Sequence, residues 1–218
     1  MENNILTQTQ IAFIKEFGKS ALVKHFYLSG GTPLAAFYLK HRYSEDLDFF
    51  CENEFDALAI DVFLKTVKDT LGITKIDFQQ SYNRNLFFCH LKDEVLKTEF
   101  TYFPFPRLEK SSVFEGVEVD SLLDIAVNKL FTIYQRTKAR DYIDLFFIEK
   151  EHGFSIADLV RKAKLKFDWH IDPVQLGTQF IKAEKAEDYP RMIKQLDKKS
   201  FVDFFAMEAQ KLKSEIFE

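Results

Sequence analysis

Residues Ser29 to Phe50 read SGGTPLAAFYLKHRYSEDLDFF. The stretch starts with a glycine pair, Gly30 and Gly31, and ends with two carboxylates, Asp46 and Asp48, one residue apart. Residues two apart on a strand point to the same face, so the two carboxylates are predicted to project together. Glycine lets the backbone approach a ligand closely, and a helix N-terminus attracts anions. The order of these features predicts a site for a phosphate group and a divalent cation such as Mg²⁺.

Each half of this stretch also has an ordinary structural interpretation. The glycines alone are typical of a tight turn between a strand and a helix, for which Thr32 and Pro33 are the expected N-cap and first residue. The aspartates alone are typical of a solvated strand end. The stretch is neither a P-loop nor a dinucleotide fingerprint, because Lys-Ser/Thr and G-x-G-x-x-G are both absent. The prediction of a phosphate and metal site therefore depends on the glycine pair and the aspartate pair occurring together.

Composition places the chain among soluble globular proteins of one large domain, or of a core with a smaller attached domain. It has 218 residues and a formal net charge of −4, so the average charge does not predict strong nonspecific binding to nucleic acid. The 25 Phe residues are expected to pack in the core, and Cys51 and Cys89 to be buried thiols. The N-terminus lacks the pattern of a signal peptide, and no apolar run approaches the roughly 18 residues of a membrane helix. We expect a cytoplasmic protein without a membrane partner.

The pattern along the chain predicts an α+β core followed by a helical region. Helices are expected at 6–24, from Thr32 to about Leu39, and at 55–71; strands at 26–28, 46–51, 73–80, 86–91, 95–103 and 113–119; and further helices at 120–136, 139–151, 155–166, about 172–184 and 201–217. The change in character near residue 119 divides the chain into a core, 1–118, and a helical C-terminal region, 119–218, expected to pack on it.

The opening stretch resembles motif I of the nucleotidyltransferase superfamily. Its form GGT-x-L…HR-x-S-x-D-L-D-F-F is similar to that of the AbiEii/AbiGii toxin family, which includes the MenT-type toxins. The resemblance implies a mixed β-sheet core like that of DNA polymerase β, flanked by helices. It also implies two metal ions, held by Asp46, Asp48 and a third acid on a neighbouring strand. Arg42 and Ser44 match the motif; Arg42 either holds phosphate or pairs with a nearby carboxylate as a structural clamp.

The candidate for the third acid is Glu99, in the alternating run VLKTEFTYF. Lys97 and Thr101 would lie on the same strand face. The family more often has Asp here, so Glu99 departs from the pattern. It either ligates a metal or stands on an exposed strand face.

A second cluster lies in the segment NKLFTIYQRTKARDYIDLFFI of the helical region. One interpretation is a solvated helix pair with salt bridges. The segment also resembles a later motif of the family, which implies a Lys that contacts the nucleotide phosphates, here Lys129. It further implies an Asp that supports the site, either Asp141 or Asp144, three residues apart and hence on one helix face.

These features together predict a Mg²⁺- or Mn²⁺-dependent transfer of a nucleoside monophosphate from an NTP to an acceptor hydroxyl. The predicted nucleotide-binding residues are Gly30, Gly31, Thr32, Arg42, Ser44 and Lys129; the predicted metal ligands are Asp46, Asp48 and Glu99; Lys129, Asp141 and Asp144 are further catalytic candidates. The family's toxin members imply an RNA acceptor such as tRNA and a separately encoded antitoxin. The alternatives are transfer to a small molecule, and a non-catalytic nucleotidyltransferase-like binding scaffold.

Overall fold

The computed structural model describes residues 5–214, and the side chains of residues 5–213. Within these residues the chain forms two compact units. Unit 1 contains residues 5–36 and Ser44–Ser121, and unit 2 contains Phe37–Tyr43 and residues 122–214. The opening stretch is therefore shared: its glycines and aspartates belong to unit 1, and its seven-residue centre belongs to unit 2.

Unit 1 is built on a mixed sheet of seven strands in the order β3-β4-β5-β2-β1-β7-β6. The strands are β1 (Tyr27–Ser29), β2 (Leu47–Cys51), β3 (Lys75–Ser81), β4 (Arg84–His90), β5 (Val95–Tyr102), β6 (Ser112–Phe114) and β7 (Val117–Val119). The β2–β5 and β1–β7 pairs are parallel, and the other pairs are antiparallel. The mixed sheet with flanking helices confirms the predicted α+β class.

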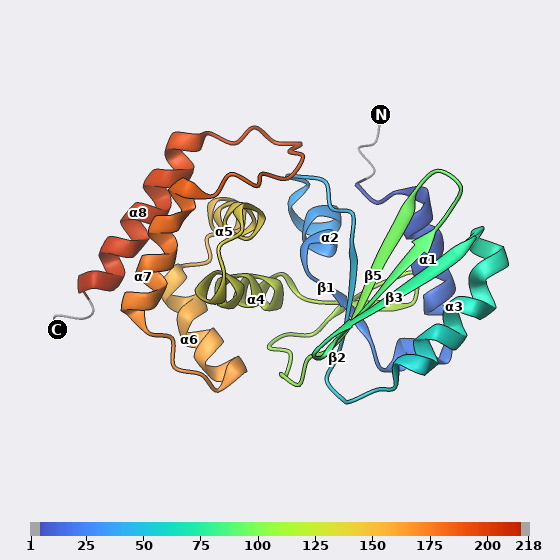
Figure 1. The fold of residues 1–218 in the computed structure, drawn as a ribbon. Helices are drawn as coiled ribbons and strands as arrows, with labels where there is room; N and C mark the ends of the chain where they lie inside the picture. The colour runs from blue at the N-terminus through green and yellow to red at the C-terminus, as the bar shows by residue number, and fades with distance from the viewer. Residues whose placement is uncertain (1–4, 215–218) are drawn as a thin grey trace. The chain divides into compact units, whose positions relative to one another are not determined.

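Two helices of unit 1, α1 (Gln8–Gly18) and α3 (Ala57–Leu71), lie along one side of the sheet (Figure 1). Phenylalanine fills the space between helices and sheet. The ring centroid of Phe17 on α1 is 4.6 Å from that of Phe49, which stacks on Phe100 at 4.9 Å. The expectation that Phe serves as core material is confirmed here, and Cys51 and Cys89 are buried free thiols as expected.

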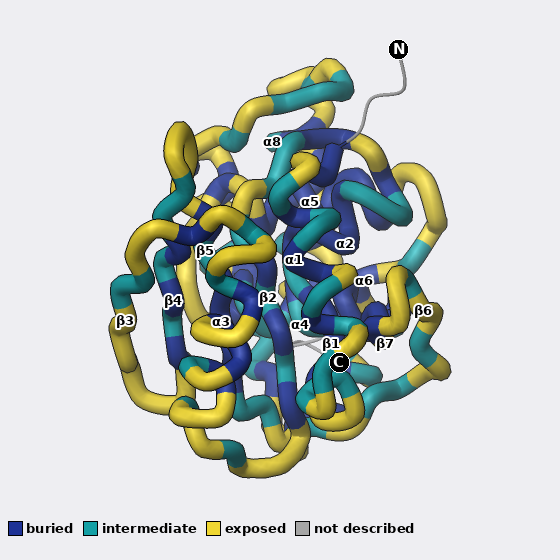
Figure 2. The backbone as a smooth tube through the Cα atoms, turned by 90° about the vertical axis from the view of Figure 1, so that its right-hand side faces the viewer, coloured by how far each residue is buried: buried dark blue, intermediate teal, exposed yellow. Residues whose placement is uncertain are grey.

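Strand β2 separates an apolar face from a polar one. Its residues are alternately buried and partly exposed, with Leu47, Phe49 and Cys51 buried. Figure 2 shows the contrast with β3 at the sheet edge, which is exposed along most of its length. Because Phe49 faces α1, Asp48 projects from the opposite side of the sheet.

Unit 2 is helical, as predicted. Its helices are α4 (Leu122–Gln135), α5 (Ala139–His152), α6 (Ile156–Phe167), α7 (Pro173–Ile181), a 3₁₀ turn (Lys182–Lys185) and α8 (Lys198–Ser214). Side-chain caps fix several starts: Ser155 accepts from Asp158 N–H, and Asp172 accepts from Gln175 N–H. The predicted helix 201–217 begins earlier, at Lys198, and its last residues, 215–217, lie outside the described part of the chain.

Two local predictions were wrong. The residue that caps α2 (Gly31–Pro33) is Gly30, at φ 82°, in place of Thr32, because the chain turns there in a backbone conformation suited to glycine. The helix then continues as a π-helical stretch, Leu34–Leu39. The single strand expected over 113–119 is a hairpin, β6–β7, that turns at Glu115 and Gly116, both with positive φ.

Candidate active site

Three carboxylates gather on the polar face of the sheet in unit 1. Asp48 on β2 is the register partner of Glu99 on the parallel strand β5. Asp46 lies two residues before Asp48, on the same side, and contacts Lys97 of β5 at 2.6 Å. We call Asp46, Asp48 and Glu99, with their counterions Lys97 and Arg84, the carboxylate face. The three acids predicted to act together are thus brought to one face of two adjacent strands.

The glycine turn is packed directly against this face. A Cβ added at Gly30 would lie 2.5 Å from Asp48 Oδ2 and 3.2 Å from its Cγ. Ser29, just before the turn, is the register partner of Asp48 on the antiparallel strand β1. A side chain at position 30 would therefore collide with the Asp48 carboxylate. Glycine is required here both for this close approach and for its positive φ.

Two hydroxyls predicted to bind nucleotide stabilise the loop that carries Asp46. The buried Thr32 Oγ1 lies 2.9 Å from Ser44 Oγ and donates a hydrogen bond to the carbonyl of Asp46. The Gln10 side-chain amide donates to the carbonyls of Ser44 and Glu45 at 3.3 and 3.0 Å. In this structure Thr32 and Ser44 thus fix the entry to β2.

The carboxylate face carries its own cations. Arg84 of β4 donates two hydrogen bonds to Glu99, at 2.6 and 2.5 Å, and Thr101 donates a third at 2.9 Å. Burial raises the pKa of Glu99, but the hydrogen bonds and charge of Arg84 outweigh it and hold that pKa below its ordinary value. Glu99 is therefore ionised at neutral pH, as a metal ligand or a counterion must be.

The donor set of this face fits a hard divalent cation. Carboxylate oxygens are the ligands that Mg²⁺ and Mn²⁺ take, and this face supplies them from β2, from β5 and from the loop just before β2. Asp46 and Asp48 would hold the cation, with Glu99 beside them. Among the side chains of residues 5–213, no three His, Cys, Asp or Glu converge as a ready-made metal cluster, and Asp46 and Glu99 are engaged by Lys97 and Arg84.

The second predicted cluster is a buried ionic network in unit 2. Asp144 of α5 accepts hydrogen bonds from Arg42 Nε at 2.6 Å and Arg42 Nη2 at 2.9 Å. It also pairs with His41 Nε2 and with Lys129 Nζ, each at 2.7 Å. Lys129 bridges to Asp141 at 2.7 Å. We call His41, Arg42, Lys129, Asp141 and Asp144 the buried ionic cluster.

Burial and charge have opposite effects on the acids of this cluster. Burial raises the pKa of Asp144, but Arg42 and Lys129 more than compensate and hold it well below its ordinary range. The pKa of Asp141 is lowered in the same way by Lys129 and Arg136. Burial lowers the pKa of His41 despite its bond to Asp144, so the ring is neutral at pH 7 and donates from Nε2. Its buried Nδ1 has no hydrogen-bond partner in the described structure.

The structure gives Arg42 a partner that sequence reasoning missed. Arg42 was expected to bind phosphate or to pair with Asp46 or Glu45, and it forms a bidentate pair with Asp144, about a hundred residues away. The surrounding segment is fixed in the same unit: Tyr43 N–H donates to the Arg191 carbonyl, and Ile193 N–H to the His41 carbonyl, both at 2.9 Å. Lys129, expected at the nucleotide phosphates, lies between Asp141 and Asp144. Its phosphate contact remains a prediction, as does the choice between these acids.

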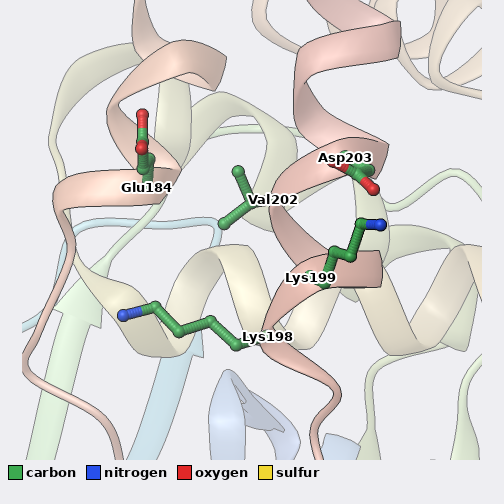
Figure 3. A pocket seen from close by; sticks show the side chains of 5 residues that line it. All are labelled: Glu184, Lys198, Lys199, Val202 and Asp203. Atoms are coloured by element: carbon green, nitrogen blue, oxygen red, sulfur yellow. The ribbon is translucent and has the colours of Figure 1, made fainter.

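A separate hollow of about 440 Å³ lies on unit 2 (Figure 3). Its lining consists of Glu184, Lys198, Lys199, Val202 and Asp203. Figure 3 shows four of these side chains coming from the start of α8 and Glu184 from the neighbouring 3₁₀ turn. None of them is a predicted site residue, so the hollow has no part in the site assignment.

Solved structures share this fold. Two crystal structures from Helicobacter pylori, one of them JHP933, superpose with a TM-score of 0.62 at 24% identity. They cover 97% and 95% of this chain, and 95% and 90% of their own. MenT4, a nucleotidyltransferase toxin from Mycobacterium tuberculosis H37Rv, superposes with a TM-score of 0.53 at 12% identity over 93% of this chain and 82% of its own. The fold is that of the nucleotidyltransferases.

Sequence comparison identifies the family. The profile of "Nucleotidyl transferase AbiEii toxin, Type IV TA system" matches residues 12–207. The chain belongs to this family and is a nucleotidyltransferase, as the resemblance in its opening stretch predicted. An uncharacterised protein of Aquifex aeolicus (strain VF5) is 31% identical over 146 residues, 65% of this chain and 66% of that protein's length. Among the described residues, no helix is both long and apolar enough to cross a membrane.

Proposed function

We propose that this protein is the toxin of a toxin–antitoxin system and transfers a nucleoside monophosphate from an NTP to a hydroxyl of RNA, in a reaction that depends on Mg²⁺ or Mn²⁺. The observation that carries the proposal is the register of Asp48 with Glu99, with Asp46 on the same face and Gly30 against Asp48. Family membership supplies the reaction class.

The chemistry follows from this arrangement. The acceptor oxygen attacks the α-phosphorus and forms a new P–O ester bond, while the bond from the α-phosphorus to the bridging oxygen of the β-phosphate breaks. Pyrophosphate leaves, and the proton of the acceptor hydroxyl passes to solvent water. Asp46 and Asp48, with Glu99, would hold a divalent cation, which would supply Lewis-acid stabilisation of the phosphoryl charge and lower the pKa of the acceptor hydroxyl. The glycine turn at Gly30 and Gly31 offers backbone N–H groups for the phosphates. Strands β2 and β5 hold Asp48 and Glu99, and the hydrogen bond from Thr32 holds the loop of Asp46. Fixed positions of this kind are what a charge-dominated reaction requires.

Formal charge is distributed unevenly between the two units. The sequence ranges of unit 1 contain 11 Lys and Arg against 18 Asp and Glu, a net charge of −7. Those of unit 2 contain 19 against 16, a net charge of +3. The unit with the candidate site is the acidic one, so the RNA acceptor is proposed from the resemblance to the toxin family and not from charge. An antitoxin protein is the second partner that we propose.

The test is to incubate the protein with each labelled NTP, Mg²⁺, and fractions of total RNA, total protein or small metabolites. We expect label in the RNA fraction and a loss of at least about 100-fold with Asp48→Asn, by analogy with the removal of a group that stabilises transition-state charge. Asp77→Asn is the matched control, because Asp77 lies on β3 of the same sheet and also carries ion pairs. It should transfer at the wild-type rate.

Other outcomes separate the alternatives. Transfer that survives Asp48→Asn would contradict the assignment of the site. Label in the small-metabolite fraction alone would replace RNA by a small acceptor. The binding-scaffold interpretation would be favoured by the absence of both transfer and NTP binding.

A further inference from the structure

The two cations of the carboxylate face have no assigned role in the transfer reaction. Lys97 and Glu99 are two residues apart on β5 and so lie on the same face. Arg84 of β4 is the register partner of Thr101, the next residue on that face. The pairing of the strands therefore places both cations at the site. The inference that follows rests on the proposed function and concerns how the same site takes up its ligands.

The two ion pairs of the carboxylate face differ in burial. The side chains of Lys97 and Asp46 are 28% and 27% exposed, whereas the Glu99 side chain that pairs with Arg84 is only 7% exposed. The Lys166–Asp124 pair of unit 2 is fully buried on both sides. Opening a pair with a buried partner leaves an uncompensated charge, whereas the partly exposed Lys97 and Asp46 can exchange partners through solvent at small cost.

Charge balance indicates what the exchange would be. A divalent cation that binds Asp46 must compete with Lys97 for its carboxylate. An incoming triphosphate brings several negative charges to the same place. An ammonium is a good point charge for phosphate, and the guanidinium fork matches two phosphate oxygens.

We propose that Lys97 is an exchangeable counterion. It holds Asp46 in position before ligands arrive, releases it when the acid takes a divalent cation, and then binds the phosphates of the nucleotide. Lys97 acts as a ligand-binding residue, and its presence limits the metal affinity of the free enzyme.

The proposal predicts effects of opposite sign from a single substitution. In Lys97→Met the competing charge at Asp46 is gone, so Mn²⁺ binding without nucleotide should tighten about three- to tenfold, as followed by the electron paramagnetic resonance of free Mn²⁺. Binding of tripolyphosphate in saturating Mn²⁺, measured by calorimetry, should weaken about tenfold. Lys97→Arg should restore the phosphate affinity. Lys75→Met, which removes an ion-paired lysine from β3, should change neither affinity.

A purely structural role would give a different pattern. If Lys97 only held Asp46 in place, Lys97→Met would weaken Mn²⁺ binding, and that result would overturn the proposal, as would an unchanged affinity. Far-ultraviolet circular dichroism checks that each variant is folded. If the wild-type enzyme transfers nucleotide and binds Mn²⁺, but Lys97→Met does not show the two opposite changes in affinity, only this inference is overturned. A wild-type enzyme that neither binds Mn²⁺ nor transfers nucleotide would overturn the proposed function as well.

Discussion

The carboxylate face of unit 1 and the buried ionic cluster of unit 2 are built from the same residue types. Each joins acids to Lys and Arg at 2.5–2.7 Å. They differ in burial at one pair: Asp144 and His41 are inaccessible to solvent, whereas Lys97 and Asp46 are both partly exposed. Exposure on both sides of a pair therefore distinguishes charges that can exchange partners from charges that cannot.

The stretch from Ser29 to Phe50 contributes residues to both sites. Asp46 and Asp48 belong to the carboxylate face, with Gly30 packed against Asp48, and would contact metal and nucleotide. His41 and Arg42, between Gly30 and Asp46 in sequence, are committed to Asp144 and help to hold the segment Phe37–Tyr43 in unit 2. A buried charge pair contributes little net stability over an apolar one, but breaking it is costly because the remaining partner cannot regain water. The buried ionic cluster thus keeps the segment Phe37–Tyr43 bound to α5 through Asp144.

The largest effect should come from breaking the buried ionic cluster. Asp144→Asn leaves the buried Arg42 with an uncompensated charge, while Lys129 keeps only Asp141. We expect this substitution to lower the free energy of unfolding by about 3–5 kcal/mol, measured by urea denaturation. Asp61→Asn, which removes an exposed i,i+4 pair with Lys65 on α3, should cost no more than about 0.5 kcal/mol. Equal shifts in the two variants would contradict the distinction by burial.

A smaller effect is expected where the glycine turn meets the carboxylate face. Gly30→Ala places a methyl group against Asp48 at a positive φ, so we expect a loss of about 1–3 kcal/mol in stability together with reduced transfer, because the Asp48 carboxylate must shift. Gly72→Ala is the control: Gly72 ends α3 at φ 67°, and an added Cβ meets nothing within 4 Å. It should cost about 1 kcal/mol and leave transfer unchanged. A transfer rate in Gly30→Ala equal to that of Gly72→Ala would argue against a role for Asp48 contact.

The smallest effect is a pH dependence that reports on His41. Its pKa is lowered in the folded state, so the unfolded chain binds the proton more readily, and stability should fall as pH drops below the ordinary value of about 6.5 towards the folded pKa. Asp141 and Asp144 act in a separate window: their stabilisation persists above about pH 3.8 and is lost only in stronger acid. Urea denaturation from pH 7.5 to 5 should show a slope that is flatter in His41→Gln. Parallel curves for the two proteins would rule out the neutral buried imidazole.

Sequence patterns predicted most helices and strands because side-chain alternation and helix capping depend on neighbouring residues in the chain. The alternation in 86–91 and 95–103 led to strands β4 and β5, and the amphipathic run ending at Gly72 led to α3 with a left-handed glycine cap. The failures are also local. Thr32 had cap chemistry, but the close approach to Asp48 placed glycine at the cap. The strand predicted over 113–119 included the pair Glu115–Gly116 in its interior, although this pair forms the turn.

The sequence by itself determined the family, the sheet with its helical sequel, and the facing of Asp46 and Asp48, because strand alternation and motif spacing are properties of the chain. Only the tertiary structure decided the partners of the charges. Arg84 reaches Glu99 through the β4–β5 register, and Arg42 meets Asp144 across about a hundred residues. The strength and permanence of an ion pair depend on burial, and burial is set by what the rest of the fold places around it.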